Sequence, residues 1–187
     1  MAQGFSQIPG QDFKVTFSPV MCMDSLQTLL VIATVQDLEI GQMDIKGTYL
    51  NGDLKEEIYI WQPKGFDDQS GRVCCHLIHT LYGLKQSGQE WNSRFNTFLT
   101  KNLKYQRLPV DHCHCVYIQN QNDGYNIIAI WVDNLLMIST SLEQMTKMKA
   151  EIEGEFEATD QGGPKLLLGI EISHDQQTHS ITISQGQ

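Results

Sequence analysis

A carboxylate in the middle of the most apolar stretch of the chain constrains its fold more than any other feature. The run Ile127–Val132 is followed by Asp133 and Asn134, and then by a second apolar run, Leu135–Ile138. An unpaired buried carboxylate is costly, so Asp133 must be paired, metal-bound or placed at a turn that reaches solvent. Two runs of strand-forming residues around a polar pair predict a β-hairpin with Asp133 and Asn134 in its turn, because both residue types tolerate left-handed backbone. Asp133 is then either a plain turn residue or a functional carboxylate at the edge of a sheet.

Composition limits the classes of protein to which the chain can belong. Of its 187 residues, 41% are hydrophobic, which is ordinary for a globular domain and argues against disorder. The net charge of −9 argues against a free-standing nucleic-acid binder, because phosphate contacts need clustered Lys and Arg. The apolar runs are too short for a membrane span, and no secretory signal follows Met1. The odd number of cysteines favours reduced intracellular thiols over a disulfide framework.

Hydrophobic patterns predict helices interspersed with mostly antiparallel strands. Capping-box patterns at Asp24–Gln27, Ser87–Glu90 and Ser141–Gln144 predict the starts of helices that run to about 36, beyond 99 and to about 156. We expect strands over 38–46, 57–61, 72–81, 113–119, 165–173 and 179–184, and the hairpin over 127–138. This order predicts an α+β fold, an antiparallel sheet backed by helices, in place of a doubly wound sheet.

Two carboxylates could carry chemistry, since Asp44 and Asp133 each lie near the end of a predicted strand beside an apolar run. If these strands are neighbours in one sheet, both side chains could reach one divalent cation, and hard cations such as Mg²⁺ prefer oxygen ligands. Two such ions about 3.5–4 Å apart would serve phosphoryl transfer.

Two further runs contain residue types that bind zinc. They are Cys74-Cys75-His76-x-x-His79 and His112-Cys113-His114-Cys115. Adjacent residues on a strand point to opposite faces, so neither run is expected to bring a full ligand set together.

Several blocks of the sequence resemble Ty1/copia-type retrotransposon reverse transcriptases. Gln42–Leu54 resembles the first catalytic motif of the family. Leu81–Ser87, followed by Trp91, resembles the motif that contacts template and nucleotide, and Trp131–Asn134 stands where the family has an aromatic-Val-Asp-Asp box. Shorter blocks match in the same order over essentially the whole chain: Phe5–Gln7, Thr16–Val20, Ile58-Tyr59, Gln62-Pro63 and Leu168–Ile172.

The resemblance implies the palm of a right-hand polymerase with part of the fingers. Residues 1–187 would form a reverse transcriptase domain truncated at both ends, with 1–35 as partial fingers and 36–187 as mainly palm with inserted fingers elements. The implied activity is RNA-directed DNA polymerisation with two Mg²⁺ ions, or Mn²⁺ in their place, on a primer–template and deoxynucleotides. The implied location is intracellular, in the cytoplasm, a virus-like particle or the nucleus. The resemblance also implies that the chain associates with other pol-derived segments and has no membrane partner.

The resemblance also assigns roles to residues. Asp44 and Asp133 would hold the two ions, which activate the primer 3′-hydroxyl and bind the triphosphate, and Asn134 would occupy the third catalytic position. Tyr49 would be the steric gate that rejects a ribose 2′-hydroxyl. The remaining nucleic-acid and nucleotide contacts would come from Tyr82 and Gly83 under the templating pair, Lys85 at phosphate, and Leu168 and Gly169 in the primer grip.

Asn134 departs from the family pattern, which has a carboxylate at this position. At an effective dielectric constant of 20, a unit charge about 4 Å away is worth roughly 4 kcal/mol per unit of partner charge. Its full loss in the transition state would slow the reaction on the order of a thousandfold. We therefore expect weak or absent polymerase activity, and a non-catalytic relic or interaction module that keeps the fold is the alternative.

Overall fold

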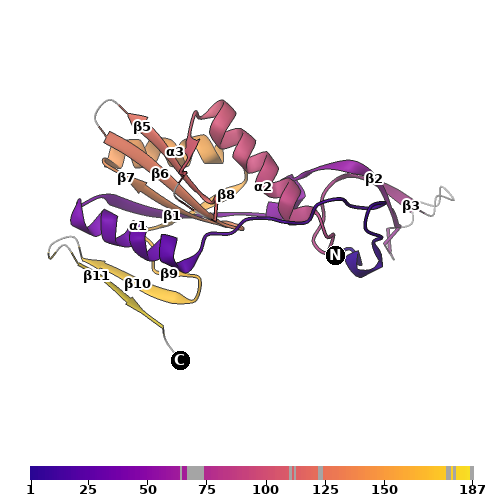
Figure 1. Ribbon diagram of the computed structural model, residues 1–187, viewed down its shortest axis with the longest axis horizontal. Helices are drawn as coiled ribbons and strands as arrows, with labels where there is room; N and C mark the ends of the chain where they lie inside the picture. The colour runs from indigo at the N-terminus through magenta and orange to yellow at the C-terminus, as the bar shows by residue number, and fades with distance from the viewer. Residues whose placement is uncertain are drawn as a thin grey trace. The chain divides into compact units, whose positions relative to one another are not determined.

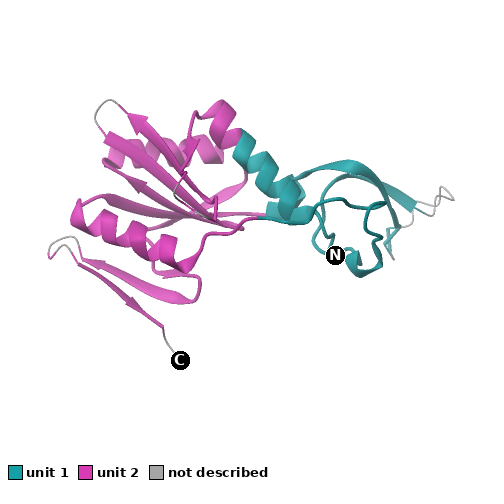
Figure 2. Cartoon of the chain, in the orientation of Figure 1, with its two compact units in different colours: residues 1–18, 47–97 teal, residues 19–46, 98–187 magenta. Residues whose placement is uncertain are grey.

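The computed structural model (Figure 1) describes residues 1–63, 65–66, 74–109, 111, 113–121, 124–175, 178 and 180–185. The chain forms two compact units, coloured separately in Figure 2. Unit 1 comprises residues 1–18 and 47–97, and unit 2 comprises residues 19–46 and 98–187. Neither unit is therefore a continuous segment of the sequence.

Unit 2 is built on an antiparallel sheet with the strand order β4-β5-β6-β7-β1-β8 (Figure 1). Its strands are β1 (Glu39–Ile45), β4 (Gln106–Arg107), β5 (Val116–Gln121), β6 (Gly124–Trp131), β7 (Asn134–Ser139) and β8 (Ala158–Gly162). Strands β6 and β7 form the predicted hairpin, and β1 pairs with β7 although nearly half of the chain separates them in sequence. The predicted mixture of helices and antiparallel strands is confirmed.

Helices pack on both faces of this sheet. The helix α1 (Met23–Val35) joins a buried cluster with Ala129, Leu136 and Ile138 of the central strands. The helix α3 (Leu142–Glu153) contacts β1, β7 and β8 on the other face. There Gly41 lets α3 approach closely, because a Cβ at this position would lie 2.9 Å from the Met145 sulfur and displace that side chain.

Unit 2 also contains a π-helical turn and a smaller antiparallel sheet. The turn is η3 (Phe98–Asn102), and the sheet has the order β11-β10-β9, with β9 (Leu166–Leu167), β10 (Ile170–Asp175) and β11 (Ser180–Ser184). This sheet extends the α1 cluster with Leu167 and Ile172. Helix α1, which the resemblance assigned to the fingers portion, belongs to unit 2, and the division into fingers and palm stays a prediction. Among the residues that the structure describes, no helix is both long and apolar enough to cross a membrane.

Unit 1 consists of an antiparallel strand pair, a longer helix and short helical turns. The elements are η1 (Gly4–Ser6), η2 (Thr48–Asn51), β2 (Asp53–Trp61), β3 (Cys74–His79) and α2 (Ser87–Thr97). The buried rings of Trp91 and Phe95 on α2 lie 5.1 Å apart between centroids. Lys55 on β2 pairs with the buried carboxylate of Glu90 at 2.7 Å, which ties the strand to the helix.

The helices form where the sequence predicts them, but two of the capping boxes were wrong. The Ser141 hydroxyl accepts a hydrogen bond from the Gln144 amide at 3.2 Å, which confirms that cap. Helix α1 instead begins after Cys22, with Asp24 already inside its first turn. Ser87 lies inside α2 and donates its hydroxyl proton to the Leu81 carbonyl, so it does not cap the helix.

Backbone conformation corrects two of the predicted strands. Asn134 is not a turn residue: it is the first residue of β7 and pairs with Trp131, so the turn is Val132–Asp133. Val132 takes the left-handed conformation with φ of +54°, which strains a β-branched residue. The strand predicted over 165–173 breaks into β9 and β10 at Leu168 and Gly169, which both have positive φ. The sequence also missed the short β4 and the polar β8.

A buried carboxylate organises the turn before β5. The Asp111 side chain, 5% exposed, accepts hydrogen bonds from the backbone amides of Cys113, Cys115 and Val116, at 3.3, 2.6 and 2.9 Å. It also accepts one from the Ser25 hydroxyl of α1 at 2.9 Å. Burial alone would raise the pKa of Asp111, but these hydrogen bonds hold it below its ordinary value.

Replacing this carboxylate should destabilise the protein in a pH-dependent way. We expect Asp111→Asn to lower the free energy of unfolding at pH 7 by about 1–3 kcal/mol, because an amide NH₂ would face donors that need an acceptor. Since the folded pKa is depressed, the stabilisation from Asp111 is present above the unfolded value of 3.8 and is lost as pH falls through the folded value. Urea denaturation at pH 7 and at pH 3 measures both effects, with the exposed Asp24→Asn as control. Equal stability of Asp111→Asn and the unmodified protein at pH 7 would contradict this role.

Candidate active site

Strand pairing brings the two predicted catalytic carboxylates together in unit 2. In the β1–β7 register Asp44 lies directly opposite Asn134, so their side chains share one face of the sheet. Asp133 precedes Asn134 in the tight turn, and its carbonyl accepts a hydrogen bond from the Ile45 amide at 2.8 Å. Carboxylates 89 positions apart in the sequence thus meet at the same end of two neighbouring strands.

The two carboxylates repel one another. The pKa of Asp44 is raised above its ordinary value, first by partial burial and then by the negative charge of Asp133. A half-buried carboxylate pair of this kind gains stability when a cation lies beside it. The oxygen donors and their charge therefore fit a hard divalent cation.

Asn134 is held by a network of amides. The Gln42 side chain, 2% exposed, donates from Nε2 to the Asn134 Oδ1 at 3.1 Å and to the Leu166 carbonyl at 3.3 Å. Asn134 in turn donates from Nδ2 to Oδ1 of Asp133 at 3.2 Å. The Asn134 oxygen that could bind a metal therefore already accepts a hydrogen bond from Gln42, and the Asn134 NH₂ group orients Asp133.

A pocket of about 420 Å³ lies next to Asn134 in unit 2. Its lining includes Gln42, Asn134, Lys165, Leu168 and Gly169. Leu168 and Gly169 form the two-residue loop between β9 and β10, with φ of +57° and +74°. Positive φ at both loop positions is the pattern of a type I′ turn, which costs Gly little and strains Leu. The structure therefore places the predicted primer-grip residues on the wall of a pocket that Asn134 also lines.

The remaining predicted residues lie in unit 1. The rings of Tyr49 and Tyr82 are 4.9 Å apart between centroids and tilted by 59°. Gly83 has φ of +100°, and a Cβ there would lie 2.1 Å from the Ala2 carbonyl oxygen, so only glycine fits. Lys85 is exposed, and its backbone amide donates to the Gln7 side chain at 2.7 Å. In the structure, the backbone that approaches Gly83 closely is therefore that of Ala2, within the same unit.

Gln42 is the site residue to which sequence reasoning gave no role. It lies two positions before Asp44, so alternation on β1 places both side chains on the same face. A glutamine at a buried strand position must find a partner, and that requirement is the signal that could have identified it.

Comparison with known proteins fits this geometry. A family model described as reverse transcriptase (RNA-dependent DNA polymerase) matches residues 1–187. The chain belongs to this reverse transcriptase family. The resemblance to the Ty1/copia type is also confirmed, because the similar curated proteins come from transposons of that type. Members of the family use divalent metal ions, which agrees with the character of the Asp44–Asp133 pair.

The similar proteins are much longer than this chain, and most of them are polyproteins. The chain is 34% identical over 187 residues to the retrovirus-related Pol polyprotein from transposon TNT 1-94 of Nicotiana tabacum, covering 99% of this chain and 14% of that protein. It is 37% identical over 177 residues to the retrovirus-related Pol polyprotein from transposon RE2 of Arabidopsis thaliana, covering 91% of this chain and 12% of that protein. A putative transposon Ty5-1 protein of Saccharomyces cerevisiae is 32% identical over 143 residues, and the match covers 76% of this chain and 45% of that protein. The chain therefore spans less than half the length of each of these relatives.

Removing the repulsion at the carboxylate pair should stabilise the protein. Because the folded pKa of Asp44 is raised, its unfavourable contribution appears as pH rises above 3.8 and is complete above the folded value. At neutral pH without divalent cations we expect Asp44→Asn to gain about 0.2–1 kcal/mol, the range for half-exposed charges. Added Mg²⁺ or Mn²⁺ should raise the melting temperature of the unmodified protein and leave that of Asp44→Asn nearly unchanged. Thermal unfolding with and without the cation measures these shifts. The control Asp24→Asn should respond to the cation as the unmodified protein does. An equal rise in melting temperature in Asp44→Asn and Asp24→Asn would contradict cation binding at the carboxylate pair.

Proposed function

We propose that this chain is the polymerase portion of a copia-type reverse transcriptase whose nucleotidyl transfer is weak or lost. The observation that carries the proposal is the placement of Asp44 and Asp133 at one end of adjacent strands in a sheet backed by helices. Unit 2 is then the palm and unit 1 the fingers. The proposed substrates are a nucleic-acid primer–template and deoxynucleoside triphosphates.

The carboxylates of Asp44 and Asp133 would hold two Mg²⁺ ions, for which Mn²⁺ can substitute. When bound, the ions supply charge stabilisation at the attacking and leaving oxygens of an in-line displacement. The chain's own contribution is to fix the oxygens of Asp44 and Asp133 on a rigid strand pair, with the turn held by the hydrogen bond from Ile45. The repulsion between the carboxylates favours cation entry.

The residues of unit 1 would select and position the nucleotide. Tyr49 is the proposed steric gate, and its contact with the Tyr82 ring limits the rotation that would open space for a ribose 2′-hydroxyl. Tyr82 and Gly83 would lie under the templating pair, and the exposed Lys85 would contact phosphate.

The primer would be held in unit 2. Leu168 and Gly169 form a hairpin loop that lines the pocket next to Asn134, which supports their proposed role as a primer grip. Lys165 at the same pocket adds a positive charge suited to a phosphate backbone.

Asn134 limits the activity of this site. Its amide contributes no negative charge where the family pattern has a carboxylate, and Gln42 already occupies its oxygen. This observation favours the second candidate function, a non-catalytic transposon relic or interaction module that retains the fold. Such a module would associate with other pol-derived segments, since the relatives are polyproteins.

Restoring the carboxylate separates these two functions. We expect the unmodified chain to extend a DNA primer on an RNA template barely or not at all with Mg²⁺ or Mn²⁺. Asn134→Asp should raise the rate by up to about a thousandfold, because the added charge stabilises the cation-bound transition state. Time-resolved primer extension measures both proteins, and Asp133→Asn combined with Asn134→Asp is the inactive control.

The outcomes have distinct meanings. Substantial extension by the unmodified chain would refute the relic function. An Asn134→Asp variant that folds, binds primer–template and still fails to extend it would refute the proposal that the missing carboxylate limits activity.

The steric gate is tested by sugar discrimination. In the Asn134→Asp background, Tyr49→Ala should reduce the preference for deoxyribonucleotides over ribonucleotides by about tenfold or more, because the ring no longer fills the space of the 2′-hydroxyl. Tyr49→Phe keeps the ring and should keep the preference. Competitive incorporation assays measure the ratio, and unchanged discrimination in Tyr49→Ala would exclude this residue as the gate.

A further inference from the structure

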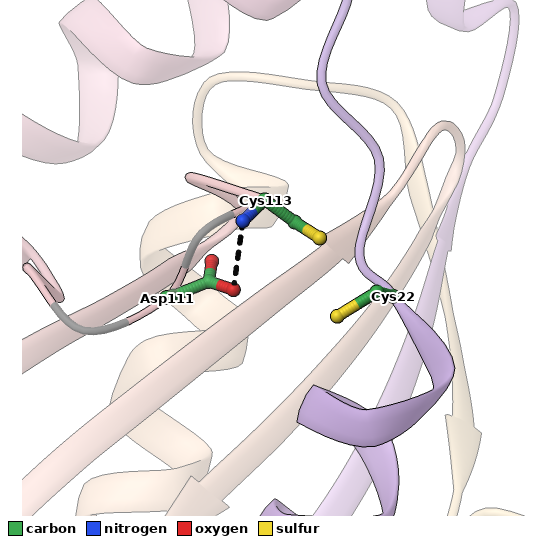
Figure 3. Close-up of side chains that lie close together, drawn as sticks. All are labelled: Cys22, Asp111 and Cys113. Carbon is green, nitrogen blue, oxygen red and sulfur yellow. Dashed lines mark hydrogen bonds between the residues drawn. The ribbon is translucent and has the colours of Figure 1, made fainter.

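Two cysteines and an aspartate, none of them part of the carboxylate pair, meet in unit 2 (Figure 3). Cys22 is the N-cap residue of α1, while Asp111 and Cys113 belong to the turn before β5. One ligand atom from each of the three residues lies within 4.8 Å of the other two. Figure 3 shows the two sulfurs on the same side of the Asp111 carboxylate, with Cys22 reaching it from the helix.

We propose that Cys22, Asp111 and Cys113 bind a thiophilic divalent cation of the Zn²⁺ type. The site would cross-link the start of α1 to the turn that precedes β5. It is separate from the Asp44–Asp133 pair, and it would act on the stability of unit 2 rather than on nucleotidyl transfer.

The spacing of the three groups suits a tetrahedral ion with one open position. Zn–S bonds of about 2.3 Å at the tetrahedral angle place two sulfurs about 3.8 Å apart. The three ligand atoms lie within 4.8 Å of one another, so movements of at most about 1 Å would bring the sulfurs to that separation. Two sulfurs and one oxygen select Zn²⁺ over Mg²⁺ or Ca²⁺, because those hard cations take oxygen ligands. The donor set thus differs in chemistry from the all-oxygen pair of the candidate active site.

Of the two thiols, Cys22 is the one whose surroundings favour ionisation. Hydrogen bonding with Ser25 and then with Cys113 lowers the pKa of Cys22, and the N-terminus of α1 adds a favourable dipole for a thiolate. The pKa of Cys113 is raised, first by its hydrogen bond with Cys22. Cys113 thus keeps the proton that the pair shares, and a bound cation would displace that proton to solvent.

Asp111 has an oxygen that can turn to an ion with little rearrangement. Its Oδ1 accepts from the Ser25 hydroxyl at 2.9 Å, and the Ser25 oxygen also lies 3.2 Å from the Cys22 sulfur. If the Ser25 hydroxyl donates to the Cys22 thiolate instead, a lone pair of Oδ1 becomes available. The other oxygen, Oδ2, stays fixed by the amides of Cys115 and Val116, so the carboxylate keeps its orientation.

The neighbouring Cys115 is unsuited to this site. It is fully buried, and its thiol donates to the Cys113 carbonyl. Burial raises the pKa of Cys115 to about 12, so this thiol stays protonated at neutral pH. The ligand set therefore combines residues from distant parts of the sequence, which neither zinc-like run of the sequence suggested.

Cobalt spectroscopy on the full chain tests the proposal. With reduced protein at pH 7.5, we expect one equivalent of Co²⁺ to give a thiolate-to-cobalt charge-transfer band and one equivalent of Zn²⁺ to remove it. Cys22→Ser and Cys113→Ser should each abolish the band and weaken Zn²⁺ binding at least tenfold, while circular dichroism shows that both variants fold. Cys74→Ser, an exposed cysteine of unit 1, is the matched control and should leave the band unchanged.

Two further measurements distinguish this site from the carboxylate pair. Excess Mg²⁺ should not reduce the band, and Asp44→Asn should retain it. The absence of a band with folded, reduced protein would overturn the proposal. A band that survives in a Cys22→Ser and Cys113→Ser double variant would overturn it as well, because the cobalt would then be bound elsewhere.

Discussion

The pairing of β1 with β7 is the interaction on which the rest of unit 2 depends. It places Asp44 opposite Asn134, puts Gln42 and Asp44 on one face, and leaves Gly41 on the face that α3 covers. A shift of the register by one residue would remove Asp44 from its place opposite Asn134 and turn the faces of β1 and β7 against each other, because alternate side chains point to opposite faces. The apolar residues on both faces hold this register, so the core and the candidate active site depend on the same constraint.

The sequence predicted correctly those local features of the fold that the chemistry of neighbouring residues determines. The apolar runs around Asp133 predicted the hairpin, and Ser141 predicted a helix cap that the structure contains. It failed where tertiary contacts override local preference: packing against neighbouring strands places the left-handed residue at Val132, against the preference of a β-branched side chain. The polar strand β8 has no hydrophobic alternation and is specified by its pairing with β1.

The candidate site shows the same division. Motif order identified Asp44, Asp133 and the departure at Asn134, because these residues lie in short blocks that resemble one family. The amide network from Gln42 and the cluster around Cys22 join segments far apart in the chain, which no local pattern encodes. The network also explains how Asn134 is accommodated: a neutral side chain satisfies Gln42 and Asp133 together, at the cost of a charge that catalysis would use.

The interleaving of the two units has a consequence for biosynthesis. Strand β1 leaves the ribosome long before β7, and all of residues 47–97 of unit 1 are made in between. During that interval both edges of β1 lack their partners, so the strand can pair with other chains. Long-range pairing of this kind also slows folding, because a large loop must close before the strands meet. The order of the segments therefore leaves β1 open to mispairing until β7 has been made.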